Sequence, residues 1–450
     1  MNFMKNTIAL IFLILLAYGV KAQIITTIVG GGTSGLGDGG PSVDCELFAP
    51  YGIAVDNVGN IYIADRGHNI IRKVDAAGII TTIAGTGGTG YTGNGGPATA
   101  ATMRTPNAVA ADNTGNVYFS DRFNNCIRKI DVAGIITTIA GDGMQGCTGD
   151  GGPATAAEFF GVSFMKFDGH GNLYISDVYN NRIRKINSAG IISTVAGIGT
   201  GSLTEVDSGD GGLATDASLG GPSGLALDNA GNLYFTEYYT HNIRKINSMG
   251  IITTIAGNDT AGYRGDGGAA TTAEFYNPTD IAIDPVGNLD ITDAHNGRLR
   301  QINIDGQINT IAGTGINGFS GDGGDATLAE FDGPVSVAVD PSGSIYISDL
   351  GNSRIRYIRN TVAVKTVDQL QDNLSVYPNP SDGEFRIMVS SKTPSPLSIA
   401  IIDELGRTIR QIPAITNETI TVKENIPPGT YFVCVKDETN AVKMTRLLIR

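Results

Sequence analysis

One pattern recurs six times along this 450-residue chain. In each copy an apolar stretch ends in Asp, a Gly-Asn or Gly-Ser turn follows, and an apolar run ends in an acid. A second run then reads Ile-Arg-Lys-Ile or a close variant. The turn glycines are Gly59, Gly115, Gly171, Gly231, Gly287 and Gly343, at steps of 56, 56, 60, 56 and 56 residues. A period of this length indicates a repeat architecture, in which each unit buries its apolar face against its neighbours.

Each copy predicts four short strands. In the third copy these are Val162–Phe167, Leu173–Ser176, Ile183–Ile186 and Ile191–Val195, all rich in β-branched and aromatic residues. Gly, Asn and Asp separate them, and residues 168–172 form a hairpin turn. Four-stranded sheets repeated about an axis make a β-propeller.

The two ends of the repeat region complete each other. The sixth copy has three predicted strands and ends at Arg354–Ile358, while a lone strand, Ile24–Ile28, precedes the first copy. Pairing the two removes two unpaired sheet edges. We therefore predict an all-β fold, a six-bladed β-propeller over residues 23–359 whose N-terminal strand closes the last blade.

Residues 1–22 predict a signal peptide. Lys5 precedes the apolar stretch Ile8–Ala17, and Val20-Lys-Ala22 is a small-residue cleavage site. An uncleaved anchor is the alternative; otherwise we expect no transmembrane segment in the mature chain. Its formal charge falls from −13 to −15 when Lys5 and Lys21 leave, which argues against nucleic acid as a partner. Four cysteines do not predict a disulfide framework, and whether Cys126 and Cys147 pair stays open.

The composition changes after Arg359. Residues 360–373 read as a linker, and residues 374–450 predict short alternating strands of a small β-sandwich. This tail contains Tyr377-Pro-Asn-Pro380, Asp403-Glu-Leu-Gly-Arg407 and Pro428-Gly-Thr-Tyr431. With these motifs it resembles the C-terminal sorting domain of type IX secretion cargo in Bacteroidota. The resemblance implies the type IX machinery as a partner, then release from the cell or attachment at its surface.

The repeats resemble NHL-repeat propellers. Asp177–Ile186 is the family-like core, and the Gly-Asp-Gly-Gly-Pro-Ala-Thr insertion resembles a bacterial subgroup that also occurs in teneurin-like proteins. The family includes binding scaffolds and a few enzymes. Fold alone therefore does not decide the function.

Polar residues that recur in every copy predict structural roles. An acid ends each second strand: Asp65, Asp121, Asp177, Glu237, Asp293 and Asp349. Seven residues later stands the arginine row, Arg72, Arg128, Arg184, Arg244, Arg300 and Arg356. We expect each arginine to pair with its strand-ending acid.

The long loops repeat a second acidic position: Asp38, Asn94, Asp150, Asp210, Asp266 and Asp322. Nine residues on stands an apolar residue: Leu47, Met103, Phe159, Leu219, Phe275 or Phe331. We predict a turn that feeds a short helix, whose apolar residue fills the blade junction. The alternative is calcium held by the loop carboxylate and backbone carbonyls; no other cofactor is expected.

Two polar residues interrupt the first strands, which line the channel. Lys166 stands where the other copies have Ala, and Asp280 where they have Gly, Ala, Phe or Ser. By strand alternation both face the axis. They either plug the channel as a charge pair or anchor a ligand at its mouth.

The loops after the second and fourth strands lie on one face, here called the top face. Two residues after the strand-ending acid, four consecutive copies carry Phe123, Tyr179, Tyr239 and His295, while Gly67 and Gly351 fill this position in the others. A crescent of rings suits a peptide or a sugar face; the alternative is that the rings only cover loop backbone. His68, His241 and His295 occupy non-equivalent loop positions, which does not predict a zinc site.

These observations predict a secreted or surface propeller that binds an extracellular peptide, protein or glycan on the top face without catalysis. The candidate ligand-binding residues are Phe123, Tyr179, Tyr239, His295, Asp280 and Lys166; no catalytic or metal-ligating residue is predicted. One alternative is a lyase or lactonase at the channel mouth, metal-dependent or not. Another is a structural surface component without a small ligand.

Overall fold

The computed structural model describes residues 23–199 and 208–359, and in the C-terminal part 373–379, 381, 384–390, 396–403, 408–415, 417–423, 426–437 and 442–449. Contacts divide the chain into two units, Met1–Asn360 and Thr361–Arg450. The predicted signal peptide and residues 360–372 of the predicted linker lie outside the described residues.

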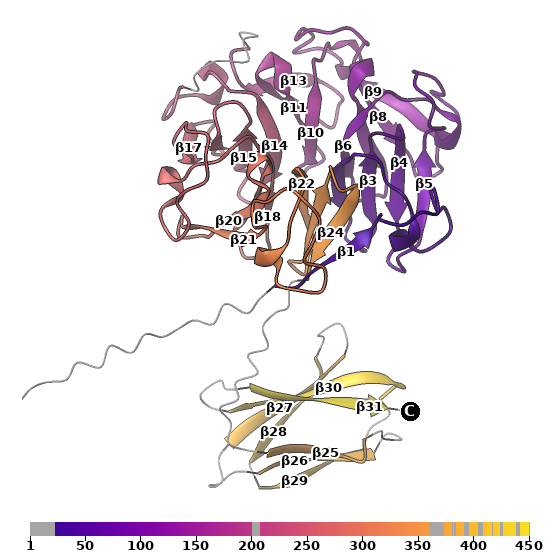
Figure 1. Cartoon of the computed structure of the whole chain (residues 1–450), viewed down its shortest axis with the longest axis vertical. Coiled ribbons are helices and arrows are strands. Elements are labelled where there is room, and N and C mark those ends of the chain that lie inside the picture. The colour runs from indigo at the N-terminus through magenta and orange to yellow at the C-terminus, as the bar shows by residue number, and fades with distance from the viewer. Residues whose placement is uncertain are drawn as a thin grey trace, which may run out of the picture. The chain divides into compact units, whose positions relative to one another are not determined.

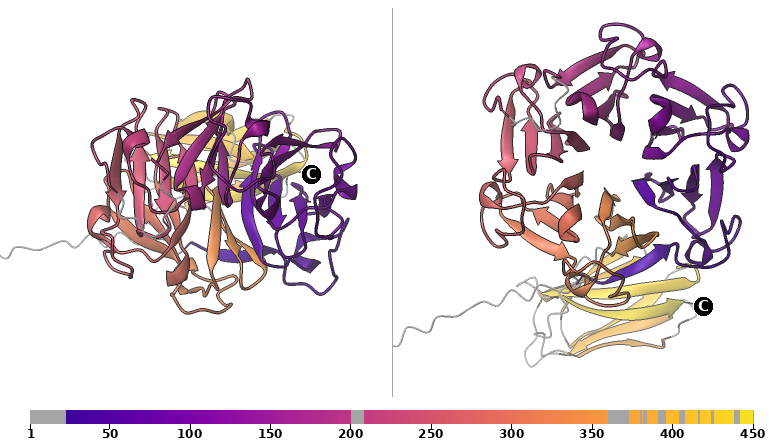
Figure 2. Two further views of the ribbon diagram at one scale, coloured as in Figure 1. Left: turned by 90° about the horizontal axis from the view of Figure 1, so that it is seen from above. Right: turned by 45° about the horizontal axis from the view of Figure 1, so that its top comes forward.

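The first unit consists of six four-stranded antiparallel sheets around a central axis (Figure 1; Figure 2, right). Blade 1 comprises β2 (Pro50–Val55), β3 (Ile61–Asp65), β4 (Ile70–Val74) and β5 (Ile80–Ala84). Blade 2 comprises β6 (Pro106–Ala111), β7 (Val117–Asp121), β8 (Cys126–Ile130) and β9 (Ile136–Ala140). Blade 3 comprises β10 (Val162–Phe167), β11 (Leu173–Asp177), β12 (Arg182–Ile186) and β13 (Ile192–Ala196). Blade 4 comprises β14 (Pro222–Leu227), β15 (Leu233–Glu237), β16 (Asn242–Ile246) and β17 (Ile252–Ala256). Blade 5 comprises β18 (Pro278–Ile283), β19 (Leu289–Asp293), β20 (Arg298–Ile302) and β21 (Ile308–Ala312). Blade 6 comprises β22 (Pro334–Val339), β23 (Ile345–Asp349), β24 (Arg354–Ile358) and β1 (Ile25–Val29). The first strands of neighbouring blades contact one another around the axis.

The N-terminal strand closes the ring. β1 runs antiparallel to β24, with Ile25 opposite Ile358 and Thr26 opposite Tyr357. The Ile25 amide donates to the Gly324 carbonyl at 3.1 Å, and the Gly323 amide donates to the Ile25 carbonyl at 2.8 Å. The predicted six-bladed fold and its closure are thus confirmed.

Short 3-10 helices fill the loops between blades. They are η1 (Ser42–Asp44), η2 (Ala98–Ala100), η4 (Ala154–Ala156), η6 (Ala214–Asp216), η7 (Ala270–Thr272) and η9 (Ala326–Leu328). The apolar residue after each is buried; Phe159, for example, packs against Ile127 of blade 2 and Ile175 of blade 3. These residues fill the blade junctions as predicted, because each loop crosses from one sheet to the next.

The arginine row is fully buried and bonded twice. Arg184 Nη2 lies 2.6 Å from Asp150 Oδ1 of the long loop, whereas its Nη1 lies 3.8 Å from Asp177 Oδ2. The Phe160 amide donates to Asp177 Oδ1 at 2.8 Å. The predicted pairing with the strand-ending acid is therefore the longer of two, and the closer partner is the loop acid, which is replaced by Asn94 in blade 2. The loop carboxylate that we considered as a calcium ligand is therefore bonded to an arginine guanidinium instead.

All four cysteines are free thiols. Cys126 is buried in β8, and Cys147 is half-buried in the following long loop. The disulfide left open above is not formed between them.

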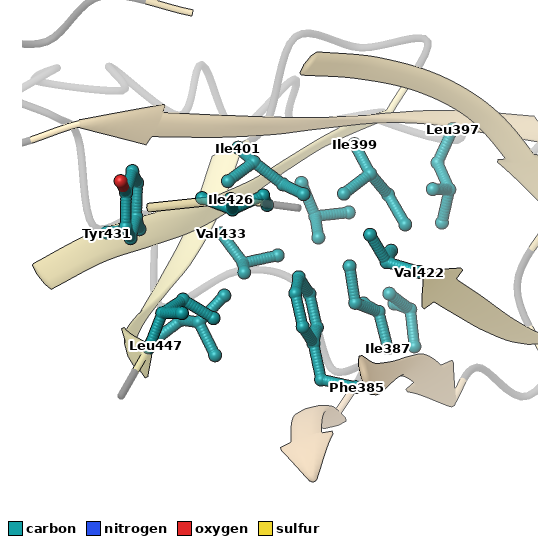
Figure 3. Packing of buried hydrophobic residues seen from close by; sticks show 13 residues of the cluster. Phe385, Ile387, Leu397, Ile399, Ile401, Val422, Ile426, Tyr431, Val433 and Leu447 are labelled. Atoms are coloured by element: carbon teal, nitrogen blue, oxygen red, sulfur yellow. The ribbon is translucent and has the colours of Figure 1, made fainter. Parts of the chain in front are cut away.

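The second unit is a β-sandwich, as predicted. One sheet holds β25 (Asn373–Tyr377), β26 (Glu384–Ser390) and β29 (Thr419–Lys423); the other holds β28 (Thr408–Ile415), β27 (Pro396–Asp403), β30 (Gly429–Asp437) and β31 (Val442–Ile449). Figure 3 shows Phe385 and Ile387 of the first sheet pointing toward Ile399 and Ile401 of the second. In the described part of the chain, no helix is long and apolar enough to cross a membrane.

Candidate ligand-binding site

The top-face loops share one backbone and differ in side chain. In blade 3 the loop is the 3-10 turn Val178–Asn180, and Asn180 Nδ2 donates to Asp177 Oδ2 at 2.8 Å. The next residue, Asn181, has a left-handed backbone with φ of 49°. The equivalent positions are also left-handed: Asn69, Asn125, His241, Gly297 and Ser353. A fixed scaffold therefore presents the two side chains that follow each strand-ending acid.

These side chains surround an upper cavity of about 350 Å³ at the top of the axis. Its walls are Tyr51, Arg66, Arg122, Tyr179, Tyr238, Tyr239 and His295. The hydroxyl residues Ser163, Ser223 and Thr279, from the starts of the inner strands, lie deeper. None of the described residues lining this cavity is an Asp or a Glu.

Two arginines give the upper cavity its charge. Arg122 Nη2 donates to Tyr179 Oη at 2.8 Å, and the buried Arg122 Nε has no hydrogen-bond partner among the described residues. The Arg66 guanidinium lies 5.3 Å from the centre of the Tyr51 ring. Burial lowers the pKa of Arg66, and the like charge of Arg122 lowers it further. This side of the cavity is therefore positive.

Blades 4 and 5 supply an aromatic wall. The rings of Tyr238 and Tyr239 lie 5.1 Å apart, and those of Tyr276 and His295 lie 4.9 Å apart, both edge-to-face. His295 Nδ1 lies 2.6 Å from Asn277 Oδ1. Burial lowers the pKa of His295, which favours the neutral imidazole at neutral pH. This side of the cavity is therefore uncharged and fixed by ring contacts.

Three of the four predicted crescent residues, Tyr179, Tyr239 and His295, line the upper cavity. Phe123 does not; it is exposed, with the guanidinium groups of Arg104 and Arg122 at 5.4 and 5.8 Å from its ring centre.

Sequence reasoning missed Tyr51, Arg66, Arg122 and Tyr238 as lining residues. A signal was available one position earlier in the loop. Directly after the strand-ending acid, blades 1 and 2 carry Arg and blade 4 carries Tyr, whereas the other blades carry Val178, Ala294 and Leu350.

Lys166 and Asp280 line a different, lower cavity of about 500 Å³, whose wall includes the hairpins that join the first and second strands of blades 2 and 3. Asp280 accepts hydrogen bonds from Ser336 Oγ at 2.7 Å and from the Val337 amide at 3.0 Å. Burial raises the pKa of Asp280 to about 6. Lys166 is exposed to the cavity, and desolvation among the surrounding inner strands lowers its pKa. The two form no ion pair, so the predicted charge pair is replaced by contacts of Asp280 with blade 6.

Two rings lie between the cavities. Tyr51 lines the upper cavity and Phe164 lines the lower one, and their ring centres are 5.7 Å apart. The six candidate residues therefore do not form one site: Tyr179, Tyr239 and His295 share the upper cavity, Lys166 and Asp280 the lower one.

Comparison with known proteins agrees with this architecture. The family model described as the secretion system C-terminal sorting domain matches residues 375–450. The teneurin NHL domain model matches residues 27–91, 87–146 and 195–264, and the NHL repeat model matches residues 331–356. The first unit is an NHL-repeat propeller, and the second is a secretion sorting domain. The sorting domain places this NHL propeller among secreted, cell-surface proteins.

Relatives of the NHL propeller include teneurin-1 of Mus musculus, 28% identical over 404 residues that cover 81% of this chain, and teneurin-4 of Homo sapiens, 28% identical over 366 residues. The chain spans 14% and 12% of these relatives. Two solved structures match with a TM-score of 0.54. A protein of unknown function from Bacteroides thetaiotaomicron is 21% identical, with 75% of this chain and 76% of that chain covered. An auxiliary nutrient binding protein from Bacteroides ovatus is 16% identical, with 75% and 77% covered. At these identities the structures support the fold alone.

Proposed function

We propose that this NHL propeller leaves the cell by the type IX route, after removal of residues 1–22, and binds an extracellular peptide, protein or glycan in the upper cavity without catalysis. The observation that carries the proposal is the cavity itself, which combines aromatic rings, hydroxyl groups and two guanidinium groups at the end of a rigid axis. Concave sites with a few convergent polar groups are the usual form of small-ligand pockets. The description of a similar fold as a nutrient binding protein is consistent with this role.

The residues of the upper cavity favour binding over catalysis. No described carboxylate lines it, and the Nδ1 atom of His295 is engaged by Asn277. Besides the arginines, its titratable groups are His295 and the tyrosines. Burial lowers the pKa of His295 and raises the pKa values of Tyr238 and Tyr239, which moves these groups away from the range near neutral pH that suits a general acid or base.

A direct test uses the mature chain, residues 23–450, on arrays of glycans and peptides. Tyr179→Ala with Tyr239→Ala should then weaken the strongest hit by about thirtyfold or more, because truncating a single aromatic anchor already costs about 2 kcal/mol. Phe123→Ala is the matched control, since this ring occupies the same loop position outside the cavity. Calorimetry that shows equal affinity for the parent and the double variant would exclude the upper cavity.

The lower cavity favours the enzymatic alternative. Lys166 has a lowered pKa and Asp280 a raised one, and such shifts concentrate at functional sites. A substrate-turnover screen that compares the parent with Lys166→Met tests it. Turnover that disappears in this variant would support an enzyme, whereas ligand binding that persists would support the binding role.

A further inference from the structure

The geometry points to a saccharide that carries a carboxylate or sulfate group as the ligand of the upper cavity, with Arg66 and Arg122 as the residues that bind the acidic group. This inference rests on the proposed binding function and adds the chemical class of the ligand.

The charge of the cavity is opposite to that of the chain. The sequence has 44 acidic and 31 basic residues, yet two arginines and no described carboxylate line this cavity. The buried arginine row shows how the same fold treats a guanidinium elsewhere: Arg184 and Arg300 each lie within 4 Å of two carboxylates. The structure records no ion pair between Arg66 or Arg122 and any described residue. An anionic ligand would supply the missing countercharge and relieve the repulsion between them.

Both guanidinium groups line the cavity and keep donors without a partner among the described residues. The hydrogen bond from Arg122 Nη2 to Tyr179 Oη fixes the guanidinium plane, and Arg122 Nε keeps a free N–H. Arg66 lies over the Tyr51 ring and has no recorded hydrogen bond to a described residue, so its donor fork is available. A planar fork matches the two oxygens of a carboxylate or sulfate better than a point charge does.

The rest of the lining favours a sugar over an acidic peptide. Four tyrosines and the hydroxyls of Ser163, Ser223 and Thr279 can exchange hydrogen bonds with ring hydroxyls, while the rings of Tyr238 and Tyr239 offer faces for stacking. The volume of about 350 Å³ lies near the small end of ligand pockets, which suits a short saccharide.

The test is calorimetry on residues 23–450 with four probes: trigalacturonic acid, a sulfated galactose disaccharide without a carboxylate, neutral maltotriose and a triglutamate peptide. We expect at least one acidic saccharide to bind about tenfold or more tightly than maltotriose. Its affinity should fall as salt rises, because the contact is ionic. The two acidic saccharides distinguish a carboxylate from a sulfate.

Arg66→Gln and Arg122→Gln should each lower the affinity for that probe about tenfold or more, because each removes half of a charged contact. Arg122→Lys should recover part of the loss, since it keeps the charge without the fork. Arg264→Gln is the matched control; this arginine is 83% exposed on an outer loop of blade 5. Each variant must melt like the parent for its affinity to count.

Several outcomes would overturn the inference. One is that neither acidic saccharide binds more tightly than maltotriose. Another is that triglutamate binds more tightly than both acidic saccharides, and a third is that neither acidic saccharide binds. An unchanged affinity in the double variant Arg66→Gln/Arg122→Gln would do the same. If the parent binds a neutral glycan or a peptide and Tyr179→Ala/Tyr239→Ala abolishes that binding, the proposed binding function still holds, but the ligand is not an acidic saccharide.

Discussion

Asp290 pairs with Gln301 across β19 and β20, where Gln301 Nε2 donates to Asp290 Oδ1 at 2.8 Å. Four other blades pair a tyrosine with a lysine at this place, as Tyr62 with Lys73, and blade 6 pairs Tyr346 with Tyr357. Asp290 is fully buried and its Oδ2 has no partner among the described residues. Burial raises the pKa of Asp290 to about 7.

This raised pKa predicts a pH dependence with a definite sign. Between its unfolded value of about 3.9 and about 7, the folded protein binds more protons at Asp290 than the unfolded chain does, so stability falls as the pH rises through this interval. The stability of Asp290→Asn relative to the parent should rise by at least about 1 kcal/mol between pH 5 and pH 8. Asp305→Asn, which removes an exposed charge of the same blade, is the control. A gain that is the same at both pH values would contradict the prediction.

Tyr179 is expected to act through Arg122 as well as through its ring. Tyr179→Phe keeps the ring and removes the acceptor that holds Arg122 Nη2. Affinity for an acidic saccharide should fall about tenfold, because one hydrogen bond to a charged group is worth about 1.5 kcal/mol or more. Affinity for a neutral hit should stay unchanged. Titration of the parent, Tyr179→Phe and the control Phe123→Leu by calorimetry tests this.

Blade 1 lacks a hydroxyl that the other blades use to bond the inner strand of the same blade or of the next one. In blade 2 the Ala108 amide donates to Ser120 Oγ at 2.9 Å, and in blade 6 Ser348 Oγ donates to the Pro50 carbonyl of blade 1 at 2.6 Å. The equivalent of these serines in blade 1 is Ala64. Ala64→Ser should add about 1 kcal/mol of stability, and Ser120→Ala should remove at least as much. Denaturant unfolding of both variants measures this. A lower denaturant concentration at the unfolding midpoint of Ala64→Ser than of the parent would contradict the prediction.

Closure predicts that the N-terminal strand is essential for folding. Deleting residues 24–28 exposes β24 as a free edge, which favours aggregation. The variant should aggregate or lose its cooperative melt. Ile24→Ala is the control, since this side chain is 49% exposed. A deletion variant that melts like the parent would show that β1 is dispensable.

The sorting domain predicts a separation of folding from export. A chain that ends after residue 373 should keep the propeller melt, because the two units have separate cores, but it should stay in the periplasm of its host. Cell fractionation with an antibody to the propeller measures this, with the full-length chain as the control. Normal levels of the shortened chain outside the cell would contradict the sorting role.

The repeat made most of the fold predictable. Six copies act as an internal alignment, so the strands, the closing pair and the buried residues such as Phe159 could be read from their spacing. The closer partner of the arginine row could not. Asp150 lies 34 residues before Arg184, and only the folded long loop brings it nearer than Asp177, seven residues away.

The candidate site was only partly predictable, for a geometric reason. A 3-10 turn has about three residues per turn, so the two residues after each strand-ending acid can both reach the cavity; Tyr238 and Tyr239 do. Sequence reasoning followed one of these positions and missed the other. It also placed Lys166 and Asp280 beside the crescent. Strand alternation predicts which residues face the axis, but it does not reveal that the rings of Phe164 in blade 3 and Tyr51 in blade 1 meet there and lie between the two cavities.

The pairing of β1 with β24 also sets the order of events during folding. These two strands are separated by more than 320 residues of chain, and the N-terminal one is synthesised first. β1 cannot pair until β24, the last strand of the propeller to be synthesised, is available. Closing so long a loop is also slow compared with local hairpin formation. We therefore expect the last step in folding to be the locking of blade 6. An incomplete chain would present β1 as an unpaired strand, a feature that a chaperone or protease could use to recognise unfinished molecules.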